Sequence, residues 1–149
     1  MFMTLSKTNI SHAIGSIDEL QCALGIVLHV FPEHADRIRA IQRHLVQCSS
    51  VLSGAVDADH FNAELARCQI DTWNAELSRT LPPIESFILI GSSIESAQIH
   101  MARAISRRAS LYVNESNQQI KDYLTNIAGF LFVLARLYTL MKDEKENTI

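Results

Sequence analysis

The chain has 149 residues, a length typical of one domain with a substantial buried core, and we treat residues 1–149 as a single domain. Hydrophobic residues make up 48% of the chain and charged residues 19%, which excludes an intrinsically disordered protein. The formal net charge of −3 excludes the broad basic surface of a typical nucleic-acid-binding protein.

The N-terminal residues and the cysteines indicate a soluble, cytoplasmic protein. The segment MFMTLSKTNI has neither the basic start nor the apolar stretch of a signal peptide. No apolar run approaches the roughly 20 residues that a membrane-spanning helix needs. The cysteines at positions 22, 48 and 68 form no CxxC pair and fall within helical patterns, so we expect buried, reduced thiols.

Two helices are expected in the first third of the chain. The first begins at a capping box, Ser16-Ile-Asp-Glu19, and ends at Pro32. The second covers residues 34–53 and is terminated by Gly54. Apolar residues recur at intervals of three and four and predict the buried faces, namely Ile17, Leu20, Leu24, Val27, Leu28 and Phe31 in the first helix, and Ile38, Ile41, Leu45, Cys48 and Leu52 in the second.

A third helix starts after caps at Asp57 and Asp59 and runs to the prolines at 82 and 83, with Phe61, Leu65, Cys68 and Leu77 on its apolar face. Residues 84–92 are expected to form an extended connector. A second capping box, residues 92–95, opens a fourth helix that runs to about Val113.

The fifth helix is expected to begin at a capping box formed by residues 116–119. Its apolar residues alternate spacings of four and three, a pattern typical of a bundle seam, and they are Ile120, Leu124, Ile127, Leu131, Leu134, Tyr138 and Met141. The tail after Lys142 is expected to be solvated and frayed. Five long helices with short links predict an all-α, up-and-down helical bundle of the ferritin-like or four-helix-bundle type.

The segment with the most chemical information is residues 87–108. Its helix carries His100, Arg103 and Arg107 at i, i+3 and i+7, so one imidazole and two guanidiniums share a helical face. Like charges in this arrangement repel each other unless an anion or a carboxylate meets them. The spacing fits either a solvated basic face or a clamp for a phosphate or carboxylate, and it leaves both readings open.

Other candidate residues also have a purely structural reading. Asp18 lies in the first turn of the first expected helix, where a carboxylate interacts favourably with the helix dipole without any further role. Phe87 and Trp73 are most simply interpreted as packing aromatics. Arg108 lies roughly 100° around the helix from Arg107, so the two cannot easily share one small ligand.

The common metal and nucleotide motifs do not occur. The six histidines are scattered, without an HExxH motif or a Cys/His ligand spacing, so we expect no protein-ligated metal. No P-loop and no Rossmann glycine motif is present. A nucleotide would therefore need another kind of binding site.

Four separated blocks fit the motifs of one known family. Residues 15–21, GSIDELQ, match G-[ST]-x-D-E-L-N, and residues 41–46, IQRHLV, match IQxxLF. Residues 81–110 match the family's LP, FILPGGS and LHxARxxxRRAER elements, and residues 123–136 match YLNRLSDxLFxLAR. Because the blocks occur in order from about residue 7 to 142, the chain resembles the PduO-type ATP:corrinoid (cobalamin) adenosyltransferases.

The resemblance implies a homotrimer with active sites between subunits, where ATP with Mg²⁺ donates its 5′-deoxyadenosyl group to cob(I)alamin. In the implied catalytic set, Asp18 matches an aspartate that pairs across the interface with the arginine matched by Arg103, and Arg107 matches an arginine that contacts the triphosphate. Phe87 matches the aromatic that crowds the lower corrin face and favours four-coordinate cobalt. The implied cofactor-binding set contains Phe87, Lys7, His100 and Thr125.

The chain departs from the family pattern in the ATP half of the site. The family's N-terminal glycine-rich loop, of TRxGDxGxT type, has no match in these 149 residues apart from Lys7 at its end. The RRAER motif reads RRASL, so Ser110 and Leu111 replace a carboxylate and an arginine. Thr125 and Gly129 replace an asparagine and an aspartate. The loss of several charge-assisted contacts predicts weak ATP binding.

Two functions remain open at this point. The first is a divergent but active cobalamin adenosyltransferase. The second is a catalytically impaired relative that binds a corrinoid and acts in delivery or as a subunit partner of an active paralogue. The altered residues favour the second function and the family likeness favours the first. Neither involves a nucleic acid or a membrane as partner.

Overall fold

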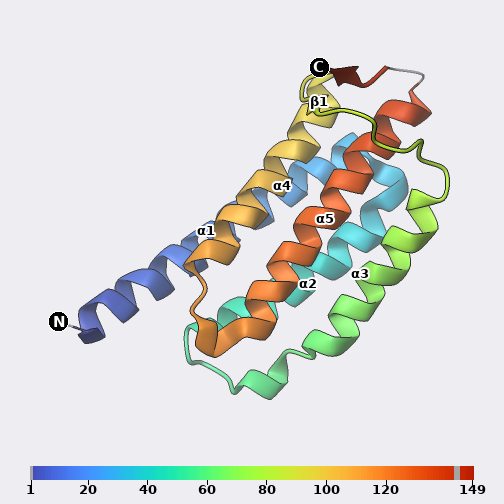
Figure 1. Ribbon diagram of the computed structural model, residues 1–149. Coiled ribbons are helices and arrows are strands. Elements are labelled where there is room, and N and C mark those ends of the chain that lie inside the picture. The colour runs from blue at the N-terminus through green and yellow to red at the C-terminus, as the bar shows by residue number, and fades with distance from the viewer. Residues whose placement is uncertain (1, 143–144) are drawn as a thin grey trace.

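The computed structural model describes residues 2–142 and 145–149, with side chains described from residue 9 onward. Its described part contains five long helices, α1 (Phe2–Val30), α2 (Ala35–Leu52), α3 (Ala63–Ser78), α4 (Ile94–Tyr112) and α5 (Gln118–Met141). Two short strands, β1 (Ile88–Leu89) and β2 (Asn147–Thr148), pair antiparallel. The expected all-α bundle is therefore confirmed, with a small strand pair added at one end (Figure 1).

Consecutive helices of the bundle run up and down (Figure 1). Helix α1 packs against α2 and α4, α4 packs against α5, and α5 packs against α3. The connector from α3 passes over one end of the bundle to reach β1 and the start of α4 (Figure 1). This arrangement gives α4 and α5 a common outer surface.

The predicted buried faces of the first two helices are confirmed, since all eleven of the named residues expose 7% of their surface or less. The predicted start of the first helix is wrong, because Ser16 lies in the middle of α1. No proline interrupts residues 2–15, and Ala13 is buried in register with Ile17 and Leu20, so the same apolar stripe continues toward the N-terminus.

The two expected stops are confirmed. Helix α1 ends at Val30, before Pro32, and α2 ends at Leu52. Gly54 has a φ of +80° and donates its N–H to the Val51 carbonyl oxygen at 3.0 Å. A glycine suits this left-handed position because it has no Cβ.

The predicted phase of the third helix is wrong in part. Helix α3 begins at Ala63, and the Asn62 side chain caps it by accepting the Leu65 N–H at 3.1 Å. The buried residues of α3 are Ala63, Ala66 and Ile70, whereas Leu65 is exposed. Small alanines form the face that packs on the bundle, and an apolar pattern built on larger residues overlooks them. Phe61 is buried, as expected, but precedes the helix.

The prediction of buried cysteines holds for Cys48 alone, because Cys22 and Cys68 are exposed. Their positions explain the difference. Cys68 lies on the outer face of α3 and Cys22 on the outer face of α1, between the buried positions Leu20 and Leu24.

The caps of the last two helices are also displaced from their predicted positions. Ser93, not Ser92, caps α4 and forms a reciprocal pair of hydrogen bonds with Ser96, at 3.1 and 3.3 Å. Residues 115–117 form a short 3-10 turn, and α5 begins at Gln118 without a side-chain cap. The bundle seam of α5 is confirmed at six of its seven predicted residues, and Met141 is exposed.

Trp73 packs within the bundle, as expected. Its ring centroid lies 5.6 Å from that of Phe130 on α5, and the Arg37 guanidinium lies over the indole at 5.8 Å. Arg37 also pairs with Glu76 at 3.0 Å. These contacts join α3 to both α5 and α2.

The described part of the C-terminal tail is not frayed, in contrast to the prediction. Strand β2 pairs with β1, and Glu146 forms an ion pair with Arg136 at 2.8 Å. The partners lie more than 50 residues away in the sequence or on a helix, so the tail's local composition could not reveal them.

Two helical stretches, Asn9–Val30 and Glu115–Met141, are long and apolar enough to cross a bilayer by length and composition alone, which corrects our expectation of no such run. Most of the second stretch is buried inside the bundle. Core helices of helical bundles have the same composition, so these two stretches are weak evidence for a membrane protein.

Candidate functional site

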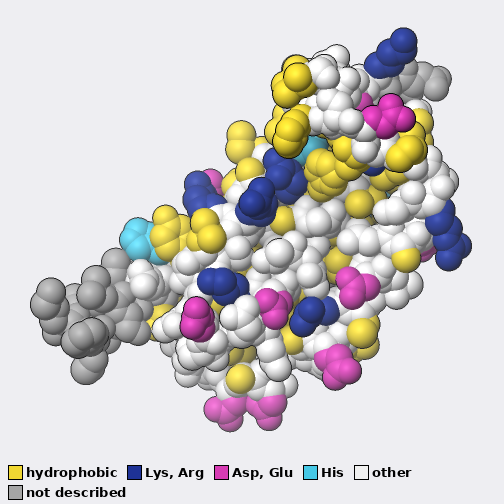
Figure 2. Space-filling view, viewed as in Figure 1, with side chains coloured by type: hydrophobic (Ala, Val, Ile, Leu, Met, Phe, Trp, Pro, Cys, Tyr) yellow, Lys and Arg dark blue, Asp and Glu magenta, His cyan; other side chains and the backbone are white. Residues whose placement is uncertain are grey.

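A groove on the common surface of α4 and α5 gathers the candidate cationic residues. It has a volume of about 460 Å³ and is lined by Arg103, Ala104, Arg107, Arg108, Ser110, Leu111 and Thr125. A neighbouring hollow of about 290 Å³ shares Arg103, Arg107 and Thr125 and adds Ala128, Gly129 and Phe132. We call these two hollows together the arginine groove. In Figure 2, basic side chains gather over α4 on this side of the molecule.

His100 lies behind Arg103 and orients it. The His100 ring is buried, its Nδ1 accepts a hydrogen bond from Arg103 Nε at 3.2 Å, and its edge packs against Phe132 at 5.9 Å between centroids. Burial and the Arg103 cation lower the pKa of His100 to about 4, so the imidazole is neutral at neutral pH. Because Nε is bound to His100, the guanidinium of Arg103 is held in one orientation at the groove.

The arginine groove has the electrostatics of an anion-binding site. Burial and the neighbouring Arg107 cation lower the pKa of Arg103, which shows that the two positive charges act on each other. None of the described residues that line the groove is an aspartate or a glutamate. An anion with several oxygen atoms would relieve this repulsion and accept hydrogen bonds from both guanidiniums.

The neutral residues of the groove offer little further to a ligand. The Ser110 hydroxyl donates to the Arg107 carbonyl oxygen at 2.6 Å, and the Thr125 hydroxyl donates to the Lys121 carbonyl oxygen at 3.2 Å. Both hydroxyl protons are therefore used within their own helices, and Gly129 has no side chain. The binding energy for an anion must come mainly from the two arginines.

Arg108 points to a different partner, in agreement with its predicted angle around the helix. Its Nη2 donates to Glu19 Oε2 on α1, and both side chains are about half exposed. Arg108 thus links α4 to α1 at the edge of the groove.

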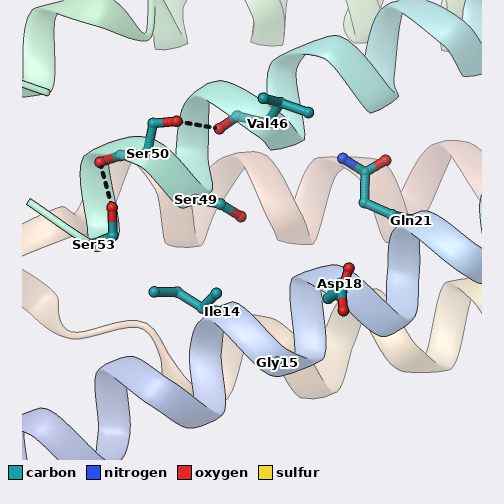
Figure 3. A pocket seen from close by; sticks show the side chains of 8 residues that line it. All are labelled: Ile14, Gly15, Asp18, Gln21, Val46, Ser49, Ser50 and Ser53. Carbon is teal, nitrogen blue, oxygen red and sulfur yellow. Dashed lines mark hydrogen bonds between the residues drawn. The ribbon is translucent and has the colours of Figure 1, made fainter. Parts of the chain in front are cut away.

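Asp18 lies in a second groove, between α1 and α2. This groove has a volume of about 460 Å³ and is lined by Ile14, Gly15, Asp18, Gln21, Val46, Ser49, Ser50 and Ser53. Figure 3 shows the Asp18 carboxylate on α1, and across the groove Ser49 and Ser50 on α2 and Ser53 directly after it. Within one chain, Asp18 and Arg103 therefore line separate grooves.

Phe87 lies on the connector before β1, and its side chain is 81% exposed. The interpretation of Phe87 as a core aromatic is therefore wrong. Other exposed apolar side chains nearby in the sequence are Leu89 on β1, Ile90 directly after it, and Ile94 and Met101 in the first turns of α4. Figure 2 shows hydrophobic side chains at this end of the molecule, close to the basic side chains of α4.

The structure thus brings four of the seven predicted site residues together, namely His100, Arg103, Arg107 and Thr125. Asp18 and Phe87 lie elsewhere on the chain, and the Lys7 side chain lies outside the described residues. Sequence reasoning missed Phe132 in the groove. Its position seven residues after Thr125, on the same face of α5, was the available signal.

No group of three or more histidine, cysteine, aspartate or glutamate side chains that could hold a metal ion occurs within the described part of the chain.

Comparison with known proteins gives consistent matches. The family model described as cobalamin adenosyltransferase matches residues 4–138. A cobalamin adenosyltransferase of Cupriavidus metallidurans is 32% identical over 84% of this chain and 72% of its own length. The corrinoid adenosyltransferase of Bos taurus is 30% identical over 92% of this chain, which spans 64% of the bovine protein.

The fold also has a counterpart among solved structures. A variant of the PduO-type ATP:corrinoid adenosyltransferase from Lactobacillus reuteri, in complex with cobalamin and ATP, superposes with a TM-score of 0.84. The match covers 95% of this chain and 83% of that structure, at 21% sequence identity. At this identity the likeness shows a common fold.

Proposed function

The chain belongs to the cobalamin adenosyltransferase family, and we propose that it transfers the 5′-deoxyadenosyl group of ATP to the cobalt atom of a corrinoid. The observation that carries this proposal is the arginine groove, where two adjacent guanidiniums meet no carboxylate among the described lining residues. A polyphosphate is a ligand that such a pair would bind.

The transfer forms a cobalt–carbon bond and breaks the bond between C5′ and its oxygen. Cobalt(I) supplies the electron pair and becomes cobalt(III), and the triphosphate leaves with the electrons of the broken bond. Since the cobalt is itself the nucleophile, the protein has to orient ATP, exclude water and stabilise the leaving group. No general base among the side chains is required.

In this proposal the triphosphate, supplied as the Mg²⁺ complex of ATP, is bound by Arg107 and by the part of the Arg103 guanidinium that is not paired with Asp18 of the next subunit. The neutral His100 keeps Arg103 in place through the bond to Nε and adds no charge to the site. The guanidiniums would stabilise the negative charge that grows on the leaving triphosphate in the transition state. Thr125 and Phe132 complete the wall of the groove beneath the ligand.

We assign the corrinoid to the end of the molecule that carries Phe87. The exposed ring and its apolar neighbours support this assignment, because a corrin ring presents a wide and largely apolar face. A bulky apolar side chain against the cobalt excludes an axial ligand and favours four-coordinate cobalt.

We further propose that the site is completed between subunits of a homotrimer. Asp18 and Arg103 line separate grooves of one chain, so a pair between them requires two copies. We expect Lys7 to lie near the same interface. We also propose that the protein is soluble and cytoplasmic.

The decisive experiment has two steps. Anaerobic calorimetry with Mg-ATP and with cobalamin, each alone, measures the two affinities, and an assay for adenosylcobalamin under strong reductant then measures turnover. We expect turnover in the wild type and its loss in Arg107→Ala. Corrinoid binding without ATP binding or turnover would instead establish the impaired relative, which the uncharged residues Ser110, Thr125 and Gly129 would then explain.

A further inference from the structure

A buried charge near the C-terminal end of α5 holds two non-helical segments together. Arg136 exposes 7% of its surface. Its Nε donates to Glu146 Oε1 at 2.8 Å, and its Nη2 donates to Glu146 Oε2 at 3.3 Å and to the Pro82 carbonyl oxygen at 2.8 Å. One guanidinium on α5 therefore binds both the connector after α3 and the C-terminal tail.

The same tail is bonded to the connector on both sides of Phe87. Strand β2 pairs with β1 directly after Phe87, and the Ile149 N–H donates to the Phe87 carbonyl oxygen at 3.1 Å. The Ser86 hydroxyl donates to the Ile149 carbonyl oxygen at 2.9 Å. The Phe87 backbone is thus held by the tail, although its ring is 81% exposed.

The strand pair is too short to be stable without further support. A two-stranded ladder is marginal in water even when it is several times longer than two residues per strand. The ion pair between Arg136 and Glu146 links this tail to the bundle, and its desolvated cation would be left without this carboxylate if the tail detached.

We infer that Arg136 and Glu146 are positioning residues for the corrin-facing aromatic. They attach the tail and the connector to α5, and they thereby fix the backbone from which the Phe87 ring projects. This inference rests on the proposed function, because it assigns Phe87 to the corrinoid.

Glu146 also links the ion pair with Arg136 to the arginine groove through its charge. The Glu146 carboxylate acts on the pKa of His100 in the opposite direction to burial and Arg103, which lower it. The carboxylate that holds the tail is therefore within electrostatic range of His100, the residue that orients Arg103.

The first test needs no corrinoid. Hydrogen–deuterium exchange of the full-length protein compares wild type with Glu146→Gln, which keeps the size of the side chain and removes its charge. The matched control is Lys145→Gln, since Lys145 is the exposed neighbour in the same tail. We expect exchange in residues 84–92 to be about tenfold faster in Glu146→Gln and unchanged in the control.

The second test reads the cobalt. Cob(II)alamin bound to the protein with ATP is measured by its absorption spectrum, which separates four-coordinate from five-coordinate cobalt. We expect Glu146→Gln to lose four-coordinate cobalt in the same direction as Phe87→Ala, and Lys145→Gln to resemble the wild type. Arg136→Lys should reproduce the effect, because one ammonium cannot replace the three bonds of the guanidinium.

The outcomes separate the two proposals. Unchanged exchange in Glu146→Gln overturns the inference, whether or not a corrinoid binds. Faster exchange in Glu146→Gln with a wild-type cobalt spectrum overturns the inference as well, because the ion pair would then have a structural role only. If the wild type binds no corrinoid, the proposed function fails, and the exchange measurement still decides whether the ion pair fixes the connector.

Discussion

At the scale of single residues, the chemistry of the arginine groove depends on two guanidiniums with different supports. Arg103 is half-buried and held by His100, whereas Arg107 is exposed. Arg107 can therefore be replaced without disturbing the packing of α4, and its removal tests the groove as an anion site.

We expect Arg107→Ala to weaken binding of Mg-ATP by roughly tenfold to a hundredfold, because a hydrogen bond to a charged group contributes about 1.5–3 kcal/mol. Arg108→Ala is the control, since Arg108 forms an exposed pair with Glu19 and such pairs contribute little. Isothermal titration calorimetry measures both affinities. Equal losses in the two variants would contradict an anion site at Arg107.

The buried neutral imidazole of His100 predicts a dependence of stability on pH. Its pKa of about 4 in the folded protein lies below the ordinary 6.5, so the unfolded chain binds a proton more readily. The contribution of His100 to the free energy of unfolding is therefore fully present above pH 6.5, and it decreases as the pH falls toward 4. From His100 alone we expect a loss of roughly 2 kcal/mol between pH 7 and pH 5.

Urea denaturation at pH 7 and pH 5 measures this loss in the wild type and in His100→Gln. The variant should lose less stability on acidification than the wild type. His34 and His44 retain a smaller effect in the same direction, since burial and a neighbouring arginine lower the pKa of each. Identical pH dependence in the two proteins would show that His100 is not buried as a neutral group.

At the scale of helices and connectors, two glycines should respond oppositely to the same substitution. Gly91, between β1 and α4, has a φ of +117°, and an added Cβ would meet no atom within 4 Å. Gly129 lies inside α5 and is equally open. The difference between them is therefore one of backbone conformation.

We expect Gly91→Ala to lower the free energy of unfolding by about 1–3 kcal/mol, because only glycine adopts this φ without strain. Gly129→Ala should raise it by about 0.5–1 kcal/mol, because alanine favours the helix and restricts the unfolded chain. Chemical denaturation of the two variants beside the wild type provides the measurement. Stabilisation by both would mean that the backbone at Gly91 is not constrained.

The elements also show what the sequence could predict and where it could not. Apolar periodicity predicted the five helices, the whole buried face of α2 and nearly all of the buried face of α1, because burial repeats with the helical period. In α5 it predicted one seam and missed other buried residues, among them Tyr123 and Phe130. Helix starts were wrong at Ser16 and Ser116, since a capping motif also occurs where the chain simply continues or forms a short turn. The tail was missed because its partners, Arg136 and β1, are brought near it only by the fold.

In the candidate site, too, the sequence predicted what depends on helical geometry and missed what depends on the packing of the helices. The i, i+4 spacing of Arg103 and Arg107 placed both in one groove, which needs only helical geometry. Phe132 was missed because an aromatic on a bundle helix is usually part of the core. The separation of Asp18 from Arg103 could not be derived either, since it depends on the order of the helices around the bundle.

At the scale of the whole molecule, the proposed pair between Asp18 and Arg103, which line separate grooves of one chain, predicts an oligomer. We expect light scattering to give three times the chain mass of 16.7 kDa. Each trimer would then contain three contacts between the Asp18 groove of one subunit and the arginine groove of the next. A monomer at micromolar concentration would contradict the proposed site.

On dilution, we expect the Arg103→Ala trimer to dissociate at a higher protein concentration than the Arg108→Ala trimer. The reason is that Arg103→Ala leaves the Asp18 carboxylate unpaired in the interface. Arg108 is paired with Glu19 within its own chain and serves as the matched control. Sedimentation velocity over a dilution series measures the difference. Equal dissociation of the two variants would contradict a pair between Asp18 and Arg103 across subunits.

The packing of Trp73 has a spectroscopic consequence. It is the chain's single tryptophan, and its ring contacts both Arg37 of α2 and Phe130 of α5. Phe132, which lines the arginine groove, follows Phe130 by two residues and so points to the other side of α5. The intrinsic fluorescence of the protein therefore reports the docking of α3 onto the bundle, separately from events in the groove.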